Sequence, residues 1–146
     1  MRSFKFRLES YFKLKVHEEK SAWKEVLKQQ GRVYQIEESI HNIQSAITSA
    51  REQLSRGHHI GTALLVEESI RGLMTKVQIL EKEKAVEGKT LDILRQKYFE
   101  KKKDSKILEN LKDKKRSDFL AEKRKKDQNL IEEISRMLQV RNKENE

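Results

Sequence analysis

Apolar residues recur every seven positions through the first third of the chain. One heptad position is occupied by Val26, Val33, Ile40, Ile47 and Leu54. A second position, three residues further along, is occupied by Ile36, Ile43 and Ala50. Apolar residues at both positions over about four heptads are typical of a helix that packs along one face in a coiled coil. The pattern therefore predicts a long first helix over about residues 4–55.

A second apolar series with the same period follows. Its two positions are occupied by Ala63, Ile70, Val77, Leu91 and Tyr98, and by Val66, Leu73, Leu80, Leu94 and Leu108. Lys84 and Glu87 interrupt the series within EKEKAVEGK, where Gly88 also weakens a helix by about 1 kcal/mol. The heptad phase is the same before and after this stretch. The series thus predicts one second helix over about residues 62–140, followed by a tail over about 141–146.

The stretch SRGHHIGT separates the two series. Gly57 is expected to end the first helix, because glycine readily adopts the left-handed conformation found at helix C-termini. Thr62 is expected to cap the second helix, with Glu67 and Glu68 in its early turns. A turn this short, over about residues 56–61, makes the helices antiparallel neighbours. The predicted fold is all-α: a long antiparallel two-helix coiled-coil hairpin, one domain over residues 1–146, with the C-terminal helix the longer.

The pairing of the two series predicts which residues face each other. If the turn is centred near residue 58, the numbers of facing residues add to about 117. Apolar residues then face apolar residues in the pairs Leu54 with Ala63, Ile47 with Ile70, Ile40 with Val77, and Val26 with Leu91. The same register places Phe12 opposite Ser105 and Phe4 near Asp113. About 30 residues of the second helix then extend beyond the first, roughly 45 Å if helical.

This overhang carries an apolar face of its own. Five apolar residues recur at helical spacing, Leu130, Ile131, Ile134, Met137 and Leu138. In the predicted register no other segment of the chain covers them. A frayed tail that folds back is one interpretation, and a helix that docks into a groove of another protein is the favoured one.

The composition fits long helices better than a globular domain. The chain of 146 residues has no proline and five glycines, and 39% of its residues are charged. Because proline interrupts helices, its absence fits a helical rod that buries only a narrow seam. The absence of cysteine excludes disulfides and thiolate metal sites and fits a reducing compartment. No run of about 18 apolar residues and no signal-peptide core occur, so a soluble protein is expected.

Residue types that support catalysis or metal binding are poorly placed. His58 and His59 are adjacent, so their side chains point apart, and no third ligand lies at a useful spacing. The glycines are scattered and form no phosphate-binding loop. Paired carboxylates such as Glu67 and Glu68 lie on predicted solvent-facing surfaces. The sequence therefore predicts no catalytic, cofactor or metal site, and the protein is not expected to be an enzyme.

Positive charge is concentrated in one region. Residues 95–126 contain fourteen lysines and arginines against six acidic residues, within a chain of net charge +9. The runs KKK at 101–103 and KRKK at 123–126 predict an electrostatic attachment surface, best matched by an acidic protein. Nucleic acid is a weaker alternative, because acids are interspersed and stacking aromatics are few. A membrane-surface role for FKFRLESYFKLK is also weaker, because Glu9 and the following HEEK oppose binding to anionic lipid.

Two stretches resemble a known family. Residues 4–22, FKFRLESYFKLKVHEEKSA, are similar to the opening of the flagellar type III export protein FliJ family, and LAEKRKKDQNLIEEIS at 120–135 is similar to its C-terminal basic and acidic signature. The resemblance implies a non-enzymatic coiled-coil stalk and adaptor, like the γ stalk of rotary ATPases. Its two ends would enter the hexameric flagellar export ATPase and promote ATPase assembly and activity. It would also link the ATPase to the export gate and to substrate chaperones.

The resemblance also implies partners, location and contact residues. The expected partners are the export ATPase, the cytoplasmic domain of the export-gate membrane protein and substrate chaperones, at the inner face of the cytoplasmic membrane at the flagellar base. The positions matching the ATPase end are Phe4, Arg7, Leu8, Lys13, Lys123, Arg124, Asp127, Gln128 and Glu133. The positions matching the gate and chaperone contacts are Ile43, Ala46, Ile47, Ala50, Ile70, Leu73 and Val77.

Three other interpretations remain open at the level of sequence. The chain could be a generic basic coiled-coil scaffold or a nucleic-acid-associated protein. It could also be the equivalent stalk of a virulence type III secretion system, whose stalk proteins share this architecture.

Overall fold

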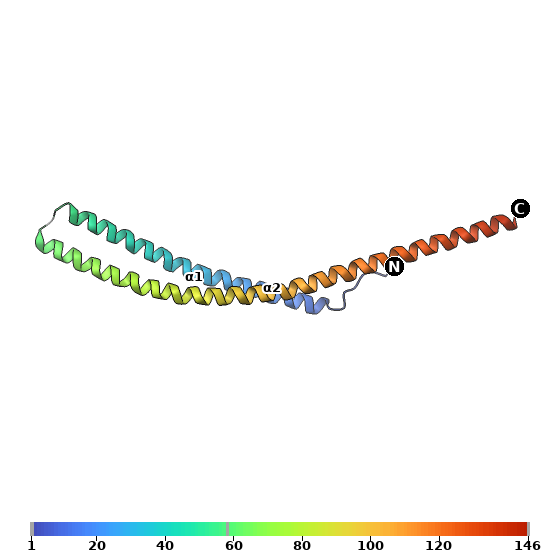
Figure 1. The fold of residues 1–146 in the computed structure, drawn as a ribbon, viewed down its shortest axis with the longest axis horizontal. Helices are drawn as coiled ribbons and strands as arrows, with labels where there is room; N and C mark the ends of the chain where they lie inside the picture. The colour runs from blue at the N-terminus through green and yellow to red at the C-terminus, as the bar shows by residue number, and fades with distance from the viewer. Residues whose placement is uncertain (1, 58, 146) are drawn as a thin grey trace. The chain divides into compact units, whose positions relative to one another are not determined.

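The structure is a computed structural model that describes residues 2–57 and 59–145. It contains two α-helices, α1 (Glu9–Ser55, 47 residues) and α2 (Ile60–Glu144, 85 residues). The described residues form no strand, and the two helices pack against each other as a hairpin (Figure 1). The prediction of an all-α helical hairpin with the longer helix at the C-terminus is therefore confirmed.

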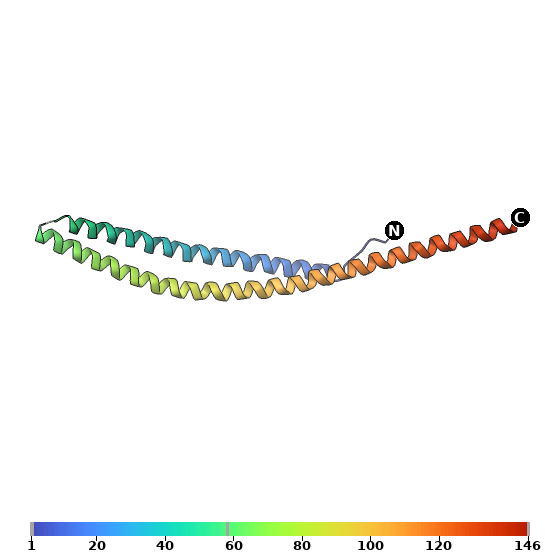
Figure 2. The same ribbon diagram turned by 45° about the horizontal axis from the view of Figure 1, so that its top comes forward.

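The chain divides into two compact units. The first, called here the hairpin unit, comprises residues 18–101. In it α1 and α2 lie side by side and run in opposite directions, as both views show (Figures 1 and 2). The second, called the terminal unit, comprises the described residues before Glu18 and after Lys101. The hairpin unit is one continuous segment, whereas the terminal unit combines segments from both ends of the sequence.

The interior of the hairpin unit is the seam predicted from the heptads. The buried apolar residues are Ala22, Val26, Ile36, Ile40, Ile47, Ile70 and Leu91. The remaining predicted positions, such as Val33, Val66 and Leu94, are half-buried. Their spacing alternates between three and four residues along both helices, which keeps one narrow face of each helix toward its partner. The heptad prediction is thus confirmed in this unit.

Polar side chains enter this seam at its centre. Gln29, only 4% exposed, donates from Nε2 to the backbone carbonyl of Glu87 at 3.0 Å and also to the Glu87 carboxylate. Lys84 pairs with Glu37 at 3.4 Å. Lys84 and Glu87, which interrupt the apolar series, therefore bind residues of α1 through polar side-chain contacts. α2 is continuous through Gly88. The predicted register places Gln29 opposite Gly88, and in the structure Gln29 contacts the neighbouring residue, Glu87.

The turn matches the prediction at one end only. Gly57 has φ +80° and follows the last turn of α1, so its predicted role as the C-terminal cap is confirmed. His58 lies outside the described residues. The prediction that Thr62 caps α2 is wrong, because α2 begins at Ile60. His59 takes this role: its Nδ1 accepts a hydrogen bond from the Gly61 backbone N–H at 3.2 Å.

The beginning of the chain differs from the predicted helix. α1 starts at Glu9 rather than near residue 4; residues 2–6 have no regular structure, and residues 7–8 form a turn. We call residues 2–8 the strap. Its apolar residues Phe4, Phe6 and Leu8 alternate with polar ones, a period of two that a helix would distribute around its surface. This alternation is the sequence signal against a helix in this segment.

The strap also changes the register at this end. The ring centroid of Phe4 lies 5.7 Å from that of Phe119, so the prediction that Phe4 faces the region of Asp113 is wrong. The physical reason is chain geometry. Between the Glu9–Lys112 ion pair and the Phe4–Phe119 contact, five residues of the strap span the length of seven helical residues, about 10 Å. Non-helical chain advances further per residue than a helix does.

Candidate partner-binding surfaces

The strap and the start of α1 are attached to α2 by aromatic and ionic contacts in the terminal unit. Phe4 and Phe6 are half-buried, with Phe4 against Phe119. Lys112 lies 2.9 Å from the Glu9 carboxylate, and its Nζ lies 5.4 Å from the ring centroid of Phe12. Such contacts of a cation with a carboxylate and an aromatic ring stabilise a partly exposed junction modestly.

The four predicted ATPase-binding residues at this end differ in accessibility. Arg7 and Lys13 are exposed and Leu8 is 38% exposed, whereas Phe4 is half-buried against α2. The side chains of Arg7, Leu8 and Lys13 can therefore contact a partner without rearrangement of the chain. Phe4 contributes instead to holding the strap on α2.

The end of α2 is exposed throughout. Every residue from Leu120 to Asn145 is exposed, and the helix continues to Glu144. We call residues 120–145 the tail. It contains the other five predicted ATPase-binding residues, Lys123, Arg124, Asp127, Gln128 and Glu133, and all five are exposed. Its apolar residues Leu130, Ile131, Ile134, Met137 and Leu138 are between 48% and 64% exposed. The tail thus presents an apolar face and charged side chains together.

Positive charge belongs to the terminal unit. Residues 2–17 contain five lysines and arginines and one glutamate. Residues 102–126 contain eleven lysines and arginines and five acidic residues. The excess of positive charge in these two segments exceeds the +9 of the whole chain. Clustered charge of one sign raises the local concentration and the association rate of oppositely charged partners. An acidic partner is therefore favoured at this unit.

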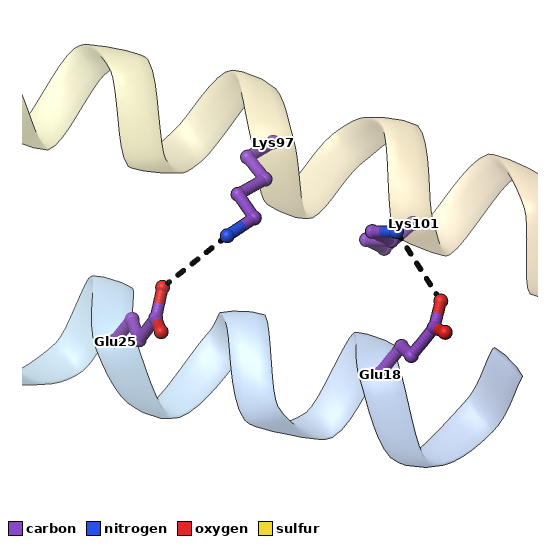
Figure 3. Close-up of polar contacts among 4 residues, drawn as sticks. All are labelled: Glu18, Glu25, Lys97 and Lys101. Carbon is purple, nitrogen blue, oxygen red and sulfur yellow. Dashed lines mark hydrogen bonds and ion pairs between the residues drawn. The ribbon is translucent and has the colours of Figure 1, made fainter. Parts of the chain in front are cut away.

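The hairpin unit balances its charges across the two helices. Glu18 pairs with Lys101 at 3.2 Å and Glu25 with Lys97 at 3.9 Å (Figure 3). In these pairs, as in Glu37–Lys84, the carboxylate belongs to α1 and the ammonium group to α2. The sequence prediction did not include these ion pairs. The sequence signal for them is acidic residues beside the apolar positions of α1 and lysines beside those of α2.

Most of the predicted gate and chaperone residues lie in the seam of the hairpin unit. Ile47 and Ile70 are buried, and Ile43, Ala50, Leu73 and Val77 are half-buried. Ala46 is the exposed member of the set. Sequence reasoning missed a group of large apolar residues that the same part of the hairpin exposes, Ile60, Leu64, Leu65, Met74 and Ile79. Their heptad positions, outside both series, are the signal that could have found them.

No group of three or more histidine, aspartate or glutamate residues within residues 2–57 and 59–145 is arranged to hold a metal ion. In the same part of the chain, neither helix contains an apolar segment long enough to cross a membrane.

Comparison with known proteins identifies the family. The model of the family described as flagellar FliJ protein matches residues 4–144. The chain belongs to the flagellar FliJ family. As a member of the FliJ family it is a component of the flagellar protein export apparatus and takes part in flagellum biogenesis and protein export. Comparisons with curated proteins and with solved structures gave no match.

FliJ proteins are structural or adaptor proteins, and the family implies partners within the export apparatus. The match covers both stretches on which the resemblance was based, 4–22 and 120–135. Among the interpretations left open by the sequence, the match therefore favours the flagellar family. It disfavours a generic scaffold and a virulence-system stalk.

Proposed function

We propose that this protein is a non-enzymatic stalk and adaptor of the flagellar export apparatus. Its N- and C-terminal ends insert into the export ATPase hexamer and promote its assembly and activity. The hairpin links the ATPase to the export gate and to substrate chaperones, at the inner face of the cytoplasmic membrane at the flagellar base.

The observation that carries the proposal is the separation of the two predicted residue sets. All nine residues assigned to ATPase binding belong to the terminal unit, and all seven assigned to the gate and chaperones belong to the hairpin unit. The terminal unit also holds the positive charge and the exposed apolar face of the tail. An exposed amphipathic helix with flanking cations is suited to a groove with apolar walls and an acidic rim.

The tail is the part to test first. Purified export ATPase from the same cell is assayed for ATP hydrolysis with the full chain and with a chain lacking residues 120–146. We expect the full chain to stimulate hydrolysis and the shortened chain to lose most of that stimulation. Circular dichroism checks that the shortened chain keeps its helices.

A matched pair of point variants refines this experiment. Ile134→Asp places a charge within the apolar face of the tail, and Gln139→Asp places the same charge on the opposite side of the helix. Ile134→Asp should raise the concentration needed for half-maximal stimulation about tenfold, because burying an isoleucine contributes about 1.5–3 kcal/mol. Gln139→Asp should change it little. Unchanged stimulation in every variant, with nucleic-acid binding that falls steeply with salt, would favour the nucleic-acid alternative instead.

The gate contact is tested on the hairpin unit. Because most predicted contact residues lie in the seam, substituting them would disturb the fold as well as binding. Ala46→Arg avoids this problem, since Ala46 is exposed, and Thr48→Arg is a control on another side of α1. We expect Ala46→Arg to weaken capture of the cytoplasmic domain of the export-gate protein. Equal weakening by both variants would exclude a specific contact at Ala46.

A further inference from the structure

The strap and α2 enclose a groove in the terminal unit. Its volume is about 1030 Å³, and its apolar lining comes from both sides, with Phe4, Phe6 and Leu8 on the strap and Leu111 and Phe119 on α2. A second, smaller groove of about 590 Å³ lies along the strap and shares Phe4 and Phe6. The strap therefore crosses α2 with room beside it for side chains from another molecule.

Cations surround the larger groove. Arg2, Lys5 and Arg7 of the strap line it together with Lys115 of α2. Two carboxylates, Asp118 and Glu122, line it as well, so the cations are in excess. The smaller groove adds Lys112 and Arg116, and Glu9 is already paired with Lys112. Since this unit also carries the positive charge of the chain, the grooves favour a negatively charged occupant.

The backbone of the strap has unused hydrogen-bonding groups. Within the described part of the chain, the N–H and C=O groups of residues 2–5 make no hydrogen bond, and the first backbone bond here runs from Glu9 N–H to the Phe6 carbonyl at 3.1 Å. These groups are available to an extended segment lying alongside the strap, in the manner of peptides that bind by backbone pairing.

From these features we propose that the groove binds an extended, acidic protein segment with one bulky apolar side chain. The apolar side chain enters the groove between Phe6 and Phe119. Its neighbouring carboxylates pair with Arg2, Lys5 or Lys115, and its backbone pairs with the strap. A membrane surface fits less well, because Asp118 and Glu122 at the groove would repel anionic headgroups.

The full chain is tested with a short fluorescein-labelled peptide that has one phenylalanine between aspartates and glutamates, by fluorescence anisotropy at low salt. A second peptide has alanine in place of the phenylalanine, and a third has lysines in place of the acids. We expect the alanine peptide to bind about tenfold more weakly, because an aromatic side chain loses its buried surface. The lysine peptide should not bind. Equal binding of the phenylalanine and alanine peptides would overturn the proposal.

Two charge reversals distinguish the groove from general attraction to a basic protein. Lys115→Glu changes a residue of the groove, and Lys125→Glu makes the same change on the exposed tail of the same helix. We expect Lys115→Glu to weaken peptide binding about fivefold and Lys125→Glu to change it little. Equal effects, or displacement of the peptide by phosphatidylserine vesicles, would overturn the proposal. The experiment contains no ATPase, so its outcome and that of the ATPase proposal are independent.

Discussion

Gln29 of α1 and Glu87 of α2 form a polar layer within the seam, with Gln29 Nε2 donating to both the carboxylate and the backbone carbonyl of Glu87. A polar pair in a coiled-coil interior costs stability and fixes the alignment of the two helices. Because Glu87 is half-buried and Gln29 nearly fully buried, loss of either partner affects the other.

This pair gives the first prediction. Gln29→Ala should lower the free energy of unfolding by about 1–3 kcal/mol, because it removes a buried side chain and leaves the Glu87 groups without their donor. The double variant Gln29→Leu/Glu87→Leu should be at least as stable as the natural chain, since it replaces both partners by apolar groups. Urea unfolding followed by circular dichroism measures both. A double variant less stable than Gln29→Ala would contradict this account.

The ion pairs of Figure 3 should differ in strength. The side chains of Glu18 and Lys101 are each 32% exposed, whereas those of Glu25 and Lys97 are more than half exposed. Double-mutant cycles with alanine should give a coupling of about 0.5–1 kcal/mol for the first pair and less for the second. Both couplings should shrink in about 0.5 M salt through screening. A larger coupling for the more exposed pair would be inconsistent with burial as the cause.

Two glycines should respond in opposite directions to the same substitution. Gly57 has φ +80°, which a residue with a Cβ adopts at a cost, so Gly57→Ala should destabilise the hairpin by about 1 kcal/mol. Gly88 lies inside α2, and a Cβ added there would meet nothing within 4 Å. Gly88→Ala should therefore stabilise the chain by about 0.5–1 kcal/mol. Thermal unfolding of the two variants side by side tests both signs, and equal shifts would contradict the assignment of Gly57 as the cap.

Cross-linking tests the alignment of the chain within the seam and at the strap. The chain has no cysteine, so introduced cysteines report without background. Cysteines at Ile40 and Val77, which the register pairs within the seam, should form a disulfide within one chain. At the strap, a short bis-maleimide should link cysteines at Phe4 and Phe119 faster than cysteines at Phe4 and Asp113. Faster linkage to position 113 would restore the helical interpretation of the strap.

The helices and the seam could be predicted because each rests on a repeating signal. Val26, Ile40 and Ile47 recur with a period that only a helix keeps on one face, and burial of that face dominates stability. Gly57 could be predicted for a similar reason, since few residues other than glycine adopt its conformation easily. The seam depends on burial of one helix face, and the Gly57 cap depends on a backbone conformation that favours glycine, so each follows from one strong physical preference.

The strap and the cap of α2 could not be predicted in the same way. Phe4 and Leu8 fit a helical stripe with Tyr11 and also fit an alternating segment with Phe6, and the contact with Phe119 decides between them. Histidine is a rarer N-cap than serine or threonine, so local preference favours Thr62 over His59. The groove depends on where the strap crosses α2, which no local pattern encodes. Ile47 and Ile70, predicted to contact the gate, are buried in the seam, and the sequence alone does not show whether a seam residue can also reach a partner.

The exposed tail has a consequence for how long a free molecule survives. A helix without packing against other parts of its protein opens readily, and the KRKK run at 123–126 is a substrate for trypsin-like proteases once it opens. We expect limited trypsin digestion to cut there before it cuts the hairpin unit, and a bound partner to protect the site. In the cell, the same difference would remove unassembled copies faster than assembled ones, so degradation would match the amount of this protein to the number of export complexes.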